Sequence, residues 1–389
     1  MRISEETSYR MMSESLVSRQ QIIGALQQQI SSGKKILYPS DDPALYEKAL
    51  NLRSDLSNIT QFQKNAETAS AELLSVENNL RNATEIFQRA GEITIRGGDS
   101  SISSVDRKAL ANEVDSMLQS LVNQANQNES GRYKYGGLRS NYQPFLVADG
   151  NGDGYIDSVT YRGDNKVKNV EIGRGVYVAS TMPGSNEGGE NAVFVTKTQD
   201  LFNELITLRD QLLAGENTVA GEATTADAGS DEFAVSGVYS TGCRVEVSSV
   251  GGNVPGGLTA GMTYYAIVTG TGVQLAASLD DARNGVPIDL TSAGTGSISI
   301  RKKTLEGITA ATEHINDLIS KVGARQETIG LQKDMLSSHE TLLNTSLANT
   351  ESIDIAETVM ALSKSQTAYE AALKAAAMFI NQPRLMDMM

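Results

Sequence analysis

The chain has 389 residues, room for roughly two to four domains, and its 33 basic and 47 acidic residues give a net charge of −14. This acidic balance argues against nucleic acid or an anionic membrane surface as a partner. No apolar run reaches the length that a membrane span requires, and the one cysteine, Cys243, cannot form an internal disulfide. Residues 1–10 lack an apolar stretch, so we expect no cleaved secretory signal.

Glycine marks the boundaries between parts of the chain that are built differently. Of its 35 glycines, 5 lie in residues 1–130, 27 in residues 131–302 and 3 beyond them. Glycine disfavours helices and suits turns, so this distribution predicts an α+β multidomain protein. Its N- and C-terminal segments are expected to form a long antiparallel helical bundle with a coiled coil, with all-β domains inserted in the middle.

Four parts are expected in this arrangement. They are terminal coiled-coil helices at 1–40 and 350–389, disordered in the monomer; a helical bundle core at 41–135 and 303–349; a small β-domain with a following helix at 136–215; and an inserted β-sandwich or barrel-like module at 216–302.

The first predicted helix carries a heptad seam and ends near Gly33, a residue that suits a left-handed helix end. Apolar residues alternate three and four positions apart, which keeps one narrow stripe facing a partner helix. Arg19 is its one polar member. The seam consists of Tyr9, Met12, Leu16, Arg19, Ile23, Leu26 and Ile30.

An ordered turn is predicted from Ile36 to Pro43. Pro39 fixes its own backbone angle, and Ser40 or Asp41 can accept hydrogen bonds from helix amides. Asp42 followed by Pro43 is typical of a helix start.

Two long helices follow this turn. Residues 49–90 keep heptad spacing, Gly97 and Gly98 interrupt it, and a third helix is expected over about residues 105–128. Long helices joined by a short glycine loop predict an antiparallel hairpin.

The segment from Asp149 to Asp157 partly matches a calcium loop. Asp149, Asn151, Asp153 and Asp157 place oxygen ligands at the first, third, fifth and ninth positions. The twelfth position, which should hold a bidentate carboxylate, is Thr160, and no helical pattern flanks the loop. A hairpin turn needs the same residue types, so the pattern favours a turn over a calcium site.

Two β-rich regions occupy the middle of the chain. Alternating apolar residues from Val159 to Val178 predict a small antiparallel β-domain, and the spacing from Phe202 to Leu212 predicts an amphipathic helix. Six alternating runs within residues 217–302 predict a sandwich or small barrel, in which Cys243 is a buried thiol. These runs are Phe233/Val235, Cys243/Val245/Val247, Tyr265/Ile267, Val273/Leu275, Ile288/Leu290 and Ile298/Ile300.

A second heptad seam lies in the last predicted helix, residues 355–380. Its many alanines offer only methyl groups, so its stability has to come from close packing against other helices. The seam consists of Ile355, Val359, Leu362, Gln366, Tyr369, Leu373, Ala376 and Ile380.

Catalytic patterns find no support in the sequence. His314 and His339 lie in helical segments, and Leu343 stands where a zinc-binding HExxH motif would have its second histidine. We find no nucleophile elbow, no phosphate-binding glycine loop before a helix and no Cys/His cluster. We therefore expect no enzyme, cofactor or metal.

Three segments resemble the bacterial flagellin superfamily, and within it the hook–filament junction branch. They are Ser31 to Arg53, the opening residues Met1 to Ser4, and Gly131 to Gly137 (GRYKYGG). The resemblance covers about residues 1–215 and 303–389. It implies that the terminal helices pack as a pair lining a tube, and that they order only when neighbouring subunits supply the missing apolar faces.

The function that this resemblance implies is structural. The chain would be an adaptor at the hook–filament junction, outside the cell, exported without a cleaved signal. Its implied partners are copies of itself in a ring, a preceding hook-associated protein, flagellin and a flagellar export chaperone. Two alternatives stay open: a filament flagellin, or a surface-displayed binding or adhesion module carried on a flagellin-like core.

Overall fold

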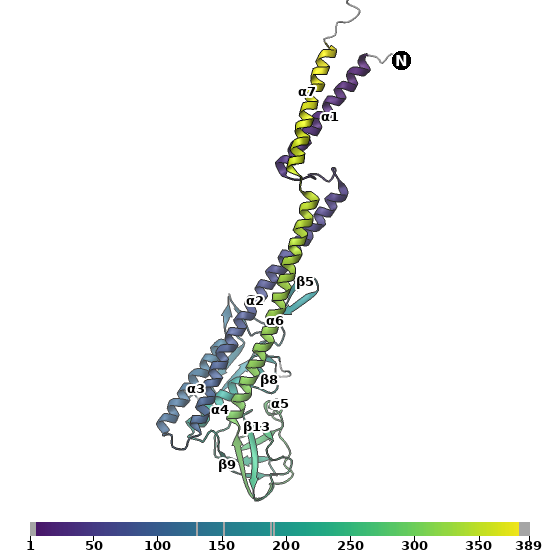
Figure 1. The fold of residues 1–389 in the computed structure, drawn as a ribbon. Helices are drawn as coiled ribbons and strands as arrows, with labels where there is room; N and C mark the ends of the chain where they lie inside the picture. The colour runs from purple at the N-terminus through teal and green to yellow at the C-terminus, as the bar shows by residue number, and fades with distance from the viewer. Residues whose placement is uncertain (1–4, 130, 151, 187–188, 190, 381–389) are drawn as a thin grey trace, which may run out of the picture. The chain divides into compact units, whose positions relative to one another are not determined.

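The computed structural model describes residues 5–129, 131–150, 152–186, 189 and 191–380 (Figure 1). Long helices occupy both ends of the chain and strands occupy its middle, which confirms the predicted α+β multidomain class. The helices are α1 (Glu5–Ser32), α2 (Pro43–Gly97), α3 (Ser104–Ala125), α4 (Leu201–Leu213), α5 (Leu279–Arg283), α6 (Thr304–Glu351) and α7 (Ile355–Ile380).

Internal contacts divide the chain into two compact units. The first unit comprises residues 1–63 and 333–389, and the second comprises residues 64–332. The expected boundaries at residues 40 and 350 lie inside the first unit, and those at 135, 215 and 302 lie inside the second.

In the first unit, α1 and α7 lie side by side over most of their length (Figure 1). The two helices come from opposite ends of the sequence, so this pairing brings the two terminal segments of the chain together. Both are helical in this structure, and their disorder in the free monomer stays a prediction.

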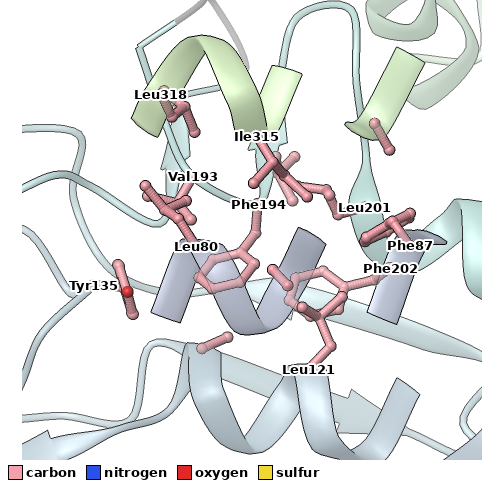
Figure 2. Close-up of a cluster of buried hydrophobic side chains, with 14 of the residues drawn as sticks. Leu80, Phe87, Leu121, Tyr135, Val193, Phe194, Leu201, Phe202, Ile315 and Leu318 are labelled. Atoms are coloured by element: carbon pink, nitrogen blue, oxygen red, sulfur yellow. The ribbon is translucent and has the colours of Figure 1, made fainter. Parts of the chain in front are cut away.

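A helical core dominates the second unit, where α2, α3, α4 and α6 bury one continuous apolar cluster. Heptad positions of α2 supply one side of it, from Ala66 to Ile93, as the spacing predicts. Phe194 and Phe202 fill the centre, with ring centroids 5.4 Å apart. Figure 2 shows these rings between residues of three long helices, namely Leu80, Phe87, Leu121, Ile315 and Leu318.

Short two-stranded ribbons, rather than one sheet, form the region that the sequence predicts as a small β-domain. Three ribbons are antiparallel, and the last is parallel. Three of the ribbons rest on the helices instead of on a sheet core of their own, as Phe145, Val178 and Val195 show by their burial in the helical cluster. The pairs are β1 (Asn128–Glu129) with β2 (Arg132–Tyr133), β3 (Phe145–Ala148) with β4 (Ser158–Tyr161), β5 (Asn169–Gly173) with β6 (Val176–Ala179), and β7 (Ser185–Asn186) with β8 (Val195–Thr196).

A closed barrel forms the inserted module. The hydrogen-bonded strand order is β10-β11-β14-β13-β12-β15-β9, so β9 and β10 lie at the two edges of this sheet. Only Thr224 separates these two strands in sequence, whereas seven flat strands at about 4.8 Å spacing would be about 29 Å wide. The strands are β9 (Gly221–Ala223), β10 (Thr225–Asp227), β11 (Glu232–Ala234), β12 (Arg244–Val250), β13 (Thr263–Val268), β14 (Val273–Ala276) and β15 (Ser297–Lys302).

Thr224 joins the two edges of this sheet. Its backbone amide donates to the carbonyl oxygen of Ile298 at 3.0 Å, and its hydroxyl donates to the carbonyl oxygen of Ala234 at 2.7 Å. Residues 221–227 therefore act as one bent strand that pairs with β15 on one side and with β11 on the other. The inserted module is therefore a barrel and not the sandwich that the sequence pattern also allowed.

Two details of the predicted barrel strands were wrong. Ile288 and Leu290 lie outside the strands, after Pro287, while residues 221–227 supply a strand that the pattern did not predict. In β13 the side chains in the barrel core are Tyr264 and Ala266, since Tyr265 and Ile267 pack on the other face with α5. A strand that is covered on both faces has no polar face, so its alternation does not reveal which face is the core.

Polar contacts seat the barrel on the helices of the second unit. Lys302, 4% exposed, pairs with Glu216, and buried Arg107 donates to the carbonyl oxygen of Glu216 at 2.8 Å. Thr218 donates to the carbonyl oxygen of Thr94 at 2.6 Å. The two ends of the inserted module are thus in contact with each other at the place where it leaves the helices.

Replacing residues 218–301 with a short Gly/Ser link is expected to leave the helical core folded. The ends already meet at Glu216 and Lys302, and the barrel has an apolar core of its own, so the change mainly alters loop entropy. Thermal unfolding followed by circular dichroism should show one cooperative helical transition. Phe202→Ala is the contrasting variant and should cost about 3–5 kcal/mol. A shortened chain without a cooperative transition would show that the barrel supports the core.

Candidate assembly surface on the terminal helices

The predicted seam of α1 faces α7. Every described apolar member of the seam is half-buried, whereas most of the rest of α1 is exposed. Arg19 shares this face, and its Nε atom is buried with no hydrogen-bond partner among the described residues. The half-buried members are Met12, Leu16, Ile23, Leu26 and Ile30.

Small residues of α7 make most of the contact with α1. The buried or half-buried positions recur every three or four residues and are mainly alanine, serine and threonine. Small side chains let two helix axes approach closely, so the pair packs tightly although it buries little apolar area. These positions are Thr358, Ala361, Leu362, Ser365, Ala368, Tyr369, Ala372 and Ala376.

The bulky members of the predicted α7 seam lie beside this contact, and solvent reaches them. Ile355, Val359 and Leu373 are 63%, 45% and 43% exposed, and Gln366 is exposed between them. We call these four residues the outer stripe. The predicted single seam is thus divided, with Leu362, Tyr369 and Ala376 buried or half-buried and the outer stripe at the exposed edge of the contact. The side chain of Ile380 lies outside the described residues.

The predicted turn before α2 is ordered by two carboxylates. Asp41 Oδ2 accepts from the backbone amides of Leu37 and Tyr38 at 3.0 and 2.9 Å. Asp42 Oδ1 accepts from the amides of Ala44 and Leu45 at 3.1 and 3.0 Å, which makes Asp42 the N-cap of α2. Gly33, with a φ of 68°, ends α1 in the left-handed region. Pro39, Ser40 and Pro43 are exposed.

A short bridge ties this turn to the connection between α6 and α7. The amide of Lys35 donates to the carbonyl oxygen of Glu351 at 2.6 Å, and the amide of Ile353 donates to that of Gly33 at 3.3 Å. The Glu351 carboxylate, 9% exposed, lies 2.7 Å from Arg53 Nη2 and 3.4 Å from Lys34 Nζ. The α1–α2 turn and the α6–α7 connection therefore meet at the Glu351 carboxylate. The sequence pattern did not identify this residue.

The Asp149–Asp157 loop uses its carboxylates on its own backbone. Asp149 accepts from the amides of Gly152 and Gly154, and Asp157 Oδ2 accepts from the amide of Gly150 at 2.7 Å. Asp153 accepts from the amide of Tyr155 at 2.8 Å. These are the contacts of an aspartate-rich turn. Asn151 lies outside the described residues, and the described ones include no group of three metal-ligating side chains.

The GRYKYGG segment has a packing role. Tyr135 is fully buried, its ring centroid is 5.0 Å from that of Phe194, and its hydroxyl accepts from Asn79 at 3.0 Å. Burial raises the pKa of Tyr135 to about 12. Gly137, at φ 65°, lies so close to the backbone of Asp164 that a Cβ atom would overlap it. This segment fastens the ribbons to the helices.

One buried acid could be taken for a catalytic group. Glu204 of α4 is buried where the barrel meets the helices, and this desolvation raises its pKa to about 7 although Arg244 opposes the shift. Arg244 Nε donates to Glu204 Oε1 at 2.9 Å, and Gln199 Nε2 donates to the same atom at 3.4 Å. Burial also raises the pKa of the neighbouring thiol, Cys243, to about 12, so this thiol is not an activated nucleophile. The cluster joins the barrel to α4.

The histidines have ordinary surroundings. His314 Nε2 is 3.0 Å from the carbonyl oxygen of Ala192, and burial lowers the pKa of this ring. His339 is exposed on α6. Among the helices of residues 5–380, none has an apolar stretch long enough to cross a bilayer.

Comparisons with known proteins point to one family. The profile of the bacterial flagellin N-terminal helical region matches residues 3–131, and that of the C-terminal helical region matches residues 305–386. Together these regions make up more than half of the chain. They contain both terminal helices and the turn signature.

Several relatives carry flagellar names. Flagellar hook-associated protein 3 of Salmonella typhimurium is 30% identical over 167 residues, which are 42% of this chain and 52% of that protein. The Escherichia coli protein of the same name is 27% identical over 166 residues, with the same coverage of 42% and 52%. The chain thus spans about half the length of the curated relatives it matches.

A solved structure shows the same fold. It is named for a flagellar hook-associated protein of Vibrio parahaemolyticus and has a TM-score of 0.50 at 16% sequence identity, covering 80% of this chain and 100% of that chain. At this identity the likeness concerns the fold alone.

Glu351→Ala is expected to loosen the bridge without unfolding the helices. The variant removes a charged hydrogen bond to Arg53, a contact worth about 1.5–3 kcal/mol, so the amides of Lys35 and Ile353 should exchange with solvent faster. Hydrogen exchange followed by mass spectrometry measures this. Glu370→Ala, on the exposed face of α7, should change nothing. Unchanged protection at the bridge would contradict the role given to Glu351.

Glu204→Gln is expected to change how stability depends on pH. Because the folded-state pKa of about 7 lies above the ordinary 4.5, folding takes up a proton between these values. This group's contribution to stability therefore falls as pH rises through that window, and glutamine should remove the fall. Urea unfolding at several pH values measures it, with exposed Glu313→Gln as control. Parallel pH profiles for the variant and the unchanged chain would rule this out.

Proposed function

This chain belongs to the bacterial flagellin family, and we propose that it is a structural adaptor joining the flagellar hook to the flagellin filament. The family matches cover both terminal regions, and two of the named relatives are flagellar hook-associated protein 3. The observation that carries the proposal is the outer stripe, a row of bulky apolar residues on a paired terminal helix with no cover in a single chain.

Assembly is the proposed mechanism. The α1–α7 pair buries mostly small side chains within one copy and exposes Ile355, Val359 and Leu373. Covering these half-exposed side chains with helices of neighbouring copies would stabilise the assembly by about 1 kcal/mol for each, roughly half of the value for a fully exposed side chain. Terminal helices that bury more apolar surface in the assembly than in a single copy would become ordered as they bind.

The proposed partners follow from this role. They are copies of the chain in a ring, a preceding hook-associated protein, flagellin and a flagellar export chaperone. We propose that the protein is exported without a cleaved signal, resides outside the cell at the junction and has no catalytic activity. In support, the buried acid Glu204 is bound by Arg244, and the neighbouring thiol Cys243 is buried. Both therefore have a structural role where the barrel contacts α4.

The inserted barrel gives little support to a binding or adhesion function. Its aromatic side chains are all engaged: Phe233 and Tyr264 are buried, while Arg244 lies over the ring of Tyr265 and Lys302 over that of Tyr239. A glycan-binding groove would need exposed aromatic faces. The filament-flagellin alternative is separated from the junction role by the experiment that follows.

A strain lacking this protein is expected to make complete hooks without filaments. Flagellin should still be exported and should collect in the culture medium, because nothing at the hook retains it. Electron microscopy of the cells, with flagellin measured in the supernatant, tests this. Full-length filaments on such cells would end the junction proposal, and long filaments formed by the purified chain alone would favour a filament flagellin.

Leu373→Asp is expected to give the same filament-less cells while the chain still folds. Leu373 lies at the edge of the α1 contact and is 43% exposed, so the charge can stay in water in a single copy but lies where a neighbouring helix has to pack, at a cost of several kcal/mol if unpaired. Thr367→Asp puts the same charge on an exposed, polar part of α7 and should support filaments. Equal behaviour of the two variants in motility and electron microscopy would remove the outer stripe from the mechanism.

A further inference from the structure

We propose that a groove on the β-ribbons of the second unit receives helix α6 of a second copy of this chain. The proposal deepens the assembly function and rests on it, because it supplies a lateral contact between copies that lies away from the terminal helices. It comes from two surfaces that the proposed function leaves unexplained, one basic and one acidic.

The first surface is a hollow of about 640 Å³ lined by residues from 138–143, by Leu146 of β3 and by Arg162, which directly follows β4. Its apolar lining includes Leu138 and Tyr142, which are 58% and 76% exposed. Arg139 and Arg162 also line it, both exposed and without a carboxylate partner in the described part of the chain. No acidic residue lines this hollow, although acidic residues outnumber basic ones 47 to 33 in the whole chain.

A second hollow, of about 540 Å³, adjoins the first and shares Leu138. Lys134 and Lys168 line it and are neutralised in part by Glu129 and Glu72. We call the two hollows together the ribbon groove. Exposed apolar side chains together with unpaired arginines suit a partner surface that combines apolar and acidic side chains.

The second surface is one face of α6. Leu331 and Met335 are 66% and 57% exposed, and Leu342 continues the same line at 64% exposed. Glu327 and Asp334 lie along one edge of this line and are exposed, with no basic partner in the described part of the chain. The helix spacing puts all five residues on the side opposite the buried Ile329 and Leu336, so we call them the α6 stripe.

The two surfaces match in chemistry. Two arginines face two carboxylates, and two apolar groups of the groove face the leucines and methionine of the stripe. From Leu331 to Leu342 the stripe is about 16 Å long. Within one copy the stripe is exposed, so its own groove does not cover it. A second copy is therefore the occupant to which the charges point.

Cross-linking between two cysteine variants tests the contact directly. Tyr142→Cys is made in one preparation and Leu331→Cys in another, and the full-length chains are mixed with a short bismaleimide. The native Cys243 is buried and does not compete. We expect severalfold more cross-linked dimer in this mixture than when Val286→Cys, on the exposed surface of the barrel, replaces the groove variant. Equal yields in the two mixtures would overturn the proposal.

A charge exchange tests the specificity of the contact. Arg139→Glu with Arg162→Glu in the groove copy should reduce the dimer to the control level. Adding Glu327→Arg with Asp334→Arg in the stripe copy should restore it, because the charges are again opposite. All four positions are exposed, so the variants should fold, which circular dichroism checks. A reversal that fails to reduce the dimer, or an exchange that fails to restore it, contradicts the assigned pair.

These results separate this proposal from the junction proposal. If cells lacking the protein keep their filaments while the purified copies cross-link as expected, the junction role fails and the contact stands. If the groove reversal stops filament formation in cells but leaves cross-linking at its original level, the groove binds a different protein and the second-copy occupant is wrong.

Discussion

The close packing of α1 against α7 through small side chains is the constraint on which the assembly surface depends. Alanines such as Ala368, Ala372 and Ala376 let the helices approach, but each methyl group buries little apolar area. The bulky residues Ile355 and Leu373 cannot share that narrow contact and lie beside it. A single copy therefore leaves its larger apolar groups partly exposed to solvent. In the proposed assembly, neighbouring copies would cover them.

Helices were predictable from this sequence because their signals are local. The last helix spans the predicted 355–380, and α1 ends immediately before Gly33, as expected. Barrel closure was not predictable, because residues 221–227 (GEATTAD) carry no alternating bulky residues and pair through their backbones. For Ile288 and Leu290 the pattern predicted a strand that does not form, because Leu290 is buried in the barrel core without belonging to a strand.

The assembly site was predictable only in part. Heptad spacing places a stripe along a helix, and on α1 it identified the residues that face α7. On α7 the bulky residues and the alanines follow neighbouring stripes, and periodicity does not say which one an alanine-rich helix buries. Glu351 carried no local signal at all, because its partner Arg53 lies 298 positions away in the sequence. Contacts of that kind exist only after the fold has formed.

Barrel closure also bears on how copies of this chain associate. An open sheet presents unpaired amides and carbonyls at its edges and can join another sheet there, whereas a closed barrel has no such edge. Here Thr224 bonds to both neighbouring strands, so the ladder continues around the module. The barrel is also held at its base by the Glu204–Arg244 and Glu216–Lys302 pairs. With strand pairing blocked in the barrel, the association that we propose would rest on the helices and the ribbon groove, where side chains rather than backbone would determine which partner fits.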